Sequence, residues 1–149
     1  MKRENRNSLS SYRTSLKLTI YDERRETCII NNEFIVEPVC PICKLPFSQF
    51  NQPSMHEVLI TKGDVGGNDF DVQLLINDAC NVVLIHEGDC HIKAQHIPEY
   101  EMLCMKQIVK YQGIEKILMY VNFVQNITMT RLTRAWNLIN EYNSQQNFF

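Results

Sequence analysis

All four histidines and four of the six cysteines fall within residues 40–96 of this 149-residue chain. Four of the first seven residues are charged and no apolar stretch follows them, so we expect no secretory signal and a cytoplasmic location. In a reducing compartment, clustered cysteine and histidine indicate metal ligation before disulfide bonding. A metal ion in the middle of the chain would therefore be the strongest constraint on how it folds.

The most specific local motif is a C-x-x-C pair formed by Cys40 and Cys43. It is typical of a zinc knuckle, in which a tight turn aims two thiolates at one ion. A redox pair has the same spacing, but it needs a helix that opens at the first cysteine, and Pro46 would interrupt that helix. His86 and Cys90 offer a second pair of ligands, and four N and S ligands close a tetrahedral site. We predict structural Zn²⁺ at these four residues, the alternative being unligated side chains with Cys90 as a small buried group.

Apolar periodicity predicts strands in the first two thirds of the chain. Residues 15–21 alternate, which indicates a strand, and two short apolar runs around Asn31-Asn32 indicate a hairpin. Residues 56–60 and 81–85 are further strand candidates. The glycines between these two segments mark a loop at Gly63, Gly66 and Gly67.

The last third of the chain predicts helices. A helix is expected to begin near Cys90, Pro98 is well placed in the first turn of the next one, and Gly113 supplies a stop. Apolar residues then recur at helical spacing in two further segments, which we expect to pack as core.

Composition excludes some classes of protein and leaves others open. An apolar fraction of 44% excludes disorder throughout the chain, and no apolar run approaches the ~20 residues that span a bilayer. The net charge of −2 does not indicate nucleic acid, yet residues 1–25 hold seven Lys and Arg against three Asp and Glu. This basic arm could track phosphates, or it could be a solvated terminal segment.

The order of the polar residues resembles the HNH endonuclease family, with its ββα-metal fold. The resemblance covers about residues 38–96. It rests on a C-x-x-C pair, a histidine-containing pair before an aliphatic residue, a glycine-bearing loop, an asparagine that opens an apolar strand, and a closing Cys/His group. Here those pieces are Cys40/Cys43, His56-Glu57-Val58, Gly63 to Gly67, Asn81 to Ile85, and His86 with Cys90-His91.

The resemblance implies hydrolysis of DNA phosphodiester bonds, with catalytic Mg²⁺ or Mn²⁺ beside the structural Zn²⁺. One member of the His56-Glu57 pair would take the proton of the attacking water. The family usually has its histidine directly before the aliphatic residue, where this chain has Glu57, so the base is either His56 or Glu57. Asn81 would fix the loop or orient the base, and His91 would ligate the catalytic cation. The family's final histidine is replaced by Gln95.

We therefore expect an α+β fold, with a zinc-stabilised ββα-metal core between an N-terminal β segment and C-terminal helices. The expected regions are a basic arm with short strands over 1–37, the HNH-like core over 38–97 and a helical region over 98–149.

The leading functional hypothesis is an HNH-type endonuclease of phage or mobile-element kind in a bacterial or phage-infected cell, with Arg131 and Arg134 holding the DNA backbone. A second is a zinc-stabilised module that binds nucleic acid or protein without catalysis. A third is a structural zinc protein whose C-terminal helices form a homodimer. In the bland alternative, His56, Glu57 and His91 are ordinary polar residues and Asn81 is a turn residue.

Overall fold

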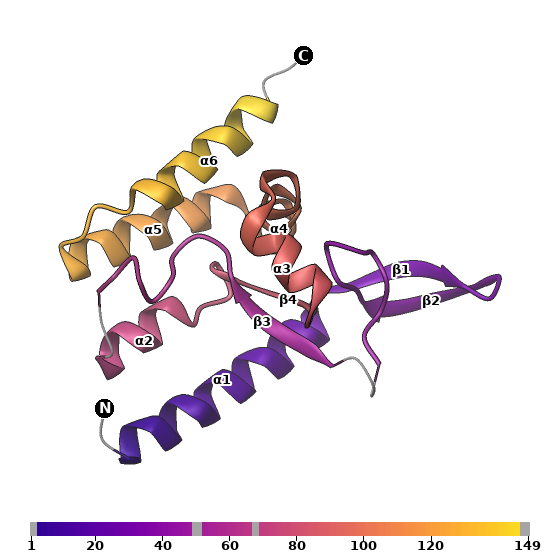
Figure 1. Ribbon diagram of the computed structural model, residues 1–149, viewed down its shortest axis with the longest axis horizontal. Helices are drawn as coiled ribbons and strands as arrows, with labels where there is room; N and C mark the ends of the chain where they lie inside the picture. The colour runs from indigo at the N-terminus through magenta and orange to yellow at the C-terminus, as the bar shows by residue number, and fades with distance from the viewer. Residues whose placement is uncertain (1–2, 49–51, 67–68, 147–149) are drawn as a thin grey trace.

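The computed structural model describes residues 3–48, 52–66 and 69–146. Within them the fold is mixed α and β, with six helices and two small antiparallel sheets (Figure 1). The strands are β1 (Arg25–Ile30), β2 (Glu33–Pro38), β3 (Pro53–Glu57) and β4 (Val82–His86). The helices are α1 (Arg3–Glu23), α2 (Phe70–Ile76), α3 (Asp89–His96), α4 (Pro98–Gln112), α5 (Ile114–Thr128) and α6 (Thr133–Gln146). None of these helices is both long and apolar enough to cross a membrane.

Strand β4 lies at the centre of the fold, and all five of its residues are buried. It pairs antiparallel with β3. Because side chains alternate along a strand, Val83 and Ile85 join the main core with the C-terminal helices. Val82 and Leu84 join a smaller cluster with Ile20 of α1. The β3–β4 pair is thus enclosed between α1 on one side and the C-terminal helices on the other (Figure 1).

The predicted hairpin around Asn31-Asn32 is confirmed as β1 and β2. Both asparagines have positive φ, +51° and +66°, as a two-residue turn with the twist of a hairpin requires. Ile29 pairs with Phe34 across the strands, and both side chains are mainly exposed. The hairpin extends outward at one end of the molecule (Figure 1).

The strand predicted over 15–21 is wrong, because these residues belong to α1, a helix of 21 residues. Leu16, Leu18 and Ile20 fit an alternating pattern, but Leu16 and Ile20 are also four apart and so share a helix face. In the structure Ile20 is buried and Leu16 packs beside it, whereas Leu18 is 60% exposed. The basic arm is therefore helical from Arg3 onward, and Lys2 lies outside the described residues.

The C-terminal helices are confirmed with their predicted punctuation. Pro98 occupies the first turn of α4, and Gly113 ends it with a φ of +85° that side chains other than glycine rarely adopt. Met105 and Ile108 of α4 and Ile117 of α5 are fully buried in the main core. That core also includes Cys40 and Ile42, so the middle and the end of the chain share one interior.

A buried arginine fastens α1 to the β3–β4 pair. Arg24 is 3% exposed, and its guanidinium donates hydrogen bonds to the carbonyl oxygens of Val82 and Ala79, both at 2.7 Å. Burial lowers the pKa of Arg24 to about 10, so the side chain remains charged at neutral pH. The two carbonyl groups are its compensation for desolvation.

We expect Arg24→Met to lower the free energy of unfolding by about 3 kcal/mol, because it removes two charge-assisted hydrogen bonds from a buried site. The neighbouring Arg25→Met is the matched control, since Arg25 is exposed and its ion pair with Asp22 is worth under about 1 kcal/mol. Urea denaturation of the two variants measures the difference. Equal losses would show that the Arg24 contacts contribute nothing beyond an exposed charge.

Candidate functional site

The Cys40–Cys43 segment forms a closed turn that brings both thiols to the same side. The Cys40 N–H donates to the Leu45 carbonyl at 3.0 Å, and the Lys44 N–H donates to the Cys40 carbonyl at 2.9 Å. Lys44 has a φ of +64°, which lets the chain reverse within the turn. The turn stands between Val39 and Pro46, which form an isolated β-bridge.

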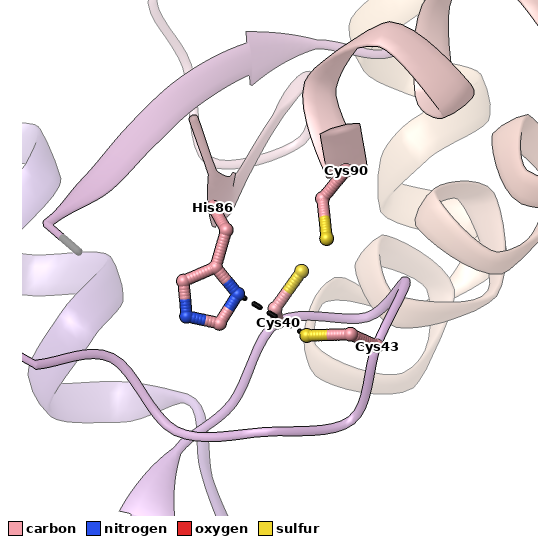
Figure 2. Close-up of side chains that lie close together, drawn as sticks. All are labelled: Cys40, Cys43, His86 and Cys90. Carbon is pink, nitrogen blue, oxygen red and sulfur yellow. Dashed lines mark hydrogen bonds between the residues drawn. The ribbon is translucent and has the colours of Figure 1, made fainter. Parts of the chain in front are cut away.

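His86 and Cys90 complete the group from the other side. His86 ends β4, Gly88 with a φ of +87° makes the turn, and Cys90 lies in the first turn of α3. One potential ligand atom from each of Cys40, Cys43, His86 and Cys90 lies within 4.8 Å of the other three. Figure 2 shows the three sulfurs and one imidazole nitrogen directed into a common space. These four residues could hold a metal ion, as the sequence predicted.

The hydrogen bonds of His86 fix which of its nitrogens faces the cluster. Nδ1 lies 3.1 Å from the Cys43 Sγ, and Nε2 lies 3.2 Å from the carbonyl oxygen of Pro46. A carbonyl only accepts, so we assign the proton to Nε2, which leaves the Nδ1 lone pair directed at the thiols. The Phe47 ring packs on the imidazole with centroids 4.7 Å apart. A histidine held by an outer carbonyl in this way is typical of metal ligation.

The electrostatics of the cluster favour a cation. Burial, followed by the neighbouring Cys40 and Cys43, raises the pKa of Cys90 to about 12, and burial also raises the pKa of Cys43. Three thiols crowded together cannot all ionise without a compensating charge. A cation supplies that charge, and three thiolates with one imidazole form a donor set of the kind that binds zinc in tetrahedral geometry.

A second polar group lies on β3 and α3. The rings of His56 and His91 meet edge to face with centroids 5.3 Å apart. The Nε2 atom of His56 is buried and has no hydrogen-bond partner in the described part of the chain. Burial, with the charges of His91 and Arg134, lowers the pKa of His56 to about 4, so the ring is neutral at physiological pH. The sequence predicted that these two histidines would serve one site, and the structure brings them together.

Glu57 occupies different surroundings from its neighbour. Burial raises the pKa of the Glu57 carboxyl, and the charges of Arg13 and Lys62 oppose that rise. Arg13 belongs to α1, and its charge acts on the pKa of Glu57. The Glu57 carboxyl therefore lies on the α1 side of the strand pair, opposite to His91. Although Glu57 borders the same cavity as His56, only His56 has a ring contact with His91.

Asn81 holds the chain that follows the histidine strand. It is fully buried, and its Oδ1 accepts from the N–H groups of Leu59 and Ile60, both at 2.8 Å. Its Nδ2 donates to the carbonyls of Ile60 and Ile76 at 2.7 and 2.9 Å. Instead of continuing to residue 60 as predicted, β3 ends at Glu57. The Val58 N–H still donates to the Asn81 backbone carbonyl at 2.7 Å, and from Leu59 onward the Asn81 side chain takes the place of the strand partner. Asn81 fixes this loop, which was one of the two roles expected for it.

The cavity beside His56 has a volume of about 500 Å³, and Arg134 and Gln95, which the sequence had singled out, are among the residues that line it. Arg134 of α6 lines it while donating to the Leu59 carbonyl at 3.1 Å and to Glu101 at 2.9 Å. Glu87, which the sequence did not indicate, accepts from His91 Nδ1 at 3.1 Å, and the Gln95 Nε2 atom lies 3.3 Å from His91 Nε2. Glu87 lies four residues before His91, and this i, i+4 spacing was the signal in the sequence that could have indicated the contact.

No family model matches the chain, and neither a curated protein nor a solved structure matches it. The chemistry of the site must therefore be argued from its own residues.

We expect the chain to bind one Zn²⁺ and Cys43→Ser to lose it, because the substitution removes one of four ligands from a buried site. Elemental analysis of dialysed protein measures the stoichiometry, and thermal denaturation should show a lower Tm for the variant. Cys28→Ser is the matched control, since Cys28 lies on the hairpin strand β1 and should leave both values unchanged. Stoichiometric zinc in Cys43→Ser would contradict this assignment.

The depressed pKa of His56 predicts a specific pH dependence of stability. Unfolding returns the ring to its ordinary pKa of 6.5, so below that pH the unfolded chain binds a proton that the folded chain refuses until about pH 4. The stability that the neutral His56 ring contributes to the folded state is complete above pH 6.5 and is lost as the pH falls toward 4. Relative to His56→Gln, the wild type should lose up to about 3 kcal/mol between pH 7 and pH 4. Parallel denaturation curves for the two proteins would contradict it.

Proposed function

We propose that the protein is a metal-dependent endonuclease of the HNH type that hydrolyses DNA phosphodiester bonds. The observation that carries this proposal is the unpartnered, buried Nε2 of His56 facing a second histidine in a cavity. A buried polar atom without a partner costs free energy, and such atoms concentrate where a ligand or a reaction uses them. The order of two antiparallel strands and a helix, with the Cys/His cluster beside them, supports the ββα-metal interpretation.

His56 is the better candidate for the general base. Its neutral ring can accept a proton from water, whereas Glu57 responds to the charges of Arg13 and Lys62 on the α1 side. A phosphate in the cavity would bring negative charge near His56 and raise its pKa toward the working pH. Arg134, already held by Leu59 and Glu101, adds a fixed positive charge to the same cavity.

Glu87 and His91 fit the second cation that the proposal requires. A carboxylate oxygen and an imidazole nitrogen 3.1 Å apart are donor types that Mg²⁺ and Mn²⁺ accept. When bound, such a cation supplies charge stabilisation to the phosphate and the leaving oxygen. The hydrogen bond of Gln95 to His91 holds the ring in place from the next turn of α3.

The role we propose for zinc is structural. Cys90 and His91 are adjacent in the first turns of α3, so an ion that ties Cys90 to the Cys40–Cys43 turn also sets where His91 points. Asn81 helps to position His56 in a similar way, because its side chain fixes the segment that follows β3. The histidine pair is thus positioned from both sides by groups that do not touch substrate.

The second candidate function is a zinc-stabilised binding module without catalysis. Both ring nitrogens of His91 already have hydrogen-bond partners, Glu87 and Gln95. If these contacts persist with DNA bound, His91 is a structural residue and the cavity is a binding surface. Binding without cleavage distinguishes this candidate from the nuclease.

The decisive experiment is cleavage of supercoiled plasmid by the zinc-loaded chain with Mg²⁺ or Mn²⁺. We expect His56→Ala and His91→Ala each to slow cleavage by at least about 100-fold, since each removes a group assigned to the reaction. His96→Ala is the matched control, because His96 is exposed on the same helix and should retain activity. Glu57→Gln should stay within about tenfold of wild type if His56 is the base.

The outcomes separate the candidates. Equal cleavage by wild type and His91→Ala would remove the histidine pair from the reaction. No cleavage of varied plasmid and phage DNA by folded, zinc-loaded wild type, together with retained DNA binding, would select the binding module. If Glu57→Gln abolishes cleavage while His56→Ala retains it, the carboxylate is the base.

A further inference from the structure

A basic groove lies along α1, outside the histidine cavity. It has a volume of about 760 Å³ and is bounded by α1 and the start of β3. Four basic side chains line it, against one acidic residue, Glu87. The four are Arg6, Arg13, Lys17 and Lys62. The groove is therefore strongly positive in a chain whose net charge is −2.

The spacing of the groove's cations along α1 is regular. Arg6, Arg13 and Lys17 are seven and four residues apart, so they share one helix face. From Arg6 to Lys17 the helix rises about 16 Å, a length over which one DNA strand presents about five phosphates. Among the described residues, none of the three makes an ion pair within 4 Å of an acidic group. Arg13 acts on the Glu57 carboxyl at longer range. Arg6 and Lys17 leave the groove with uncompensated positive charge for an external polyanion.

The groove runs into the histidine cavity along β3. Met55 and Lys62 line both hollows, and Ser54 and Met55 of the groove directly precede His56 of the cavity. Glu87, which pairs with His91, stands on the groove wall. A long, linear anion could therefore occupy the groove and the histidine cavity at the same time, whereas a small anion would fill only one of them.

We infer that this groove binds the phosphodiester backbone of a DNA duplex and leads it to His56 and His91. The inference rests on the proposed function for the direction of the path, but its charge argument stands on the groove alone. A row of cations in a groove suits a backbone that repeats. Arg13 and Lys17 are partly buried within the groove, which favours a narrow ligand over a flat anionic membrane. Binding through phosphates fixes position on the duplex and carries no base readout.

The test is fluorescence anisotropy of the full, zinc-loaded chain with labelled duplex DNA of about 30 base pairs, without Mg²⁺ or Mn²⁺. Arg13→Gln/Lys17→Gln should weaken binding at least about tenfold near 0.1 M salt and reduce the slope of log Kd against log salt by about 2. The control Lys106→Gln/Lys116→Gln makes the same charge change at exposed positions on α4 and α5. It should stay within about twofold of wild type. The pair Arg6→Gln/Lys62→Gln repeats the test should the first variant misfold.

Three results would overturn the inference. They are wild type that binds no duplex at low salt, groove and control variants that weaken equally, and binding to anionic phosphatidylserine vesicles in preference to DNA. Because no catalytic cation is present, none of these depends on cleavage. DNA binding through the groove without cleavage would support the groove inference and contradict the nuclease proposal. Cleavage that survives loss of the groove charges would support the nuclease proposal and contradict the groove inference.

Discussion

The side-chain amide of Asn81 is the contact on which the rest of the site depends. With two accepted and two donated hydrogen bonds it joins the exit of β3, the end of α2 and the entrance of β4. A side-chain amide can donate two hydrogen bonds and accept two at once without carrying a charge, and in a fully buried position each bond is expensive to lose. Without it the segment after His56 would have unpaired backbone groups in the core.

Burial on both faces of β4 then determines the layout. One face meets the C-terminal helices through Val83 and Ile85, while the other receives α1 through Ile20. The Arg24 hydrogen bonds fasten α1 to the backbone of the strand. Since α1 is fastened by these contacts, Arg6, Arg13 and Lys17 stay along the groove between α1 and the start of β3. The same packing separates the surroundings of His56 and Glu57, although they are neighbours in sequence.

The metal-ligand group was predictable because spacing encodes its geometry. Two cysteines separated by two residues, and a histidine and cysteine separated by a tight turn, leave the chain few ways to point their atoms. The identity of α1 was not predictable from residues 15–21, because apolar residues two and four apart fit a strand and a helix alike over so short a span. Which of His56 and Glu57 faces α1 was not predictable, because it depends on packing between segments that lie far apart in the sequence.

The adjacency of Cys90 and His91 has a consequence for how the protein can vary. Successive residues on a helix are rotated by about 100°, so one turn of α3 presents Cys90 to the Cys40–Cys43 turn and His91 to β3. A one-residue insertion between them would advance His91 by that angle and turn it away from His56. The helical phase of this single turn is thus shared by two sites.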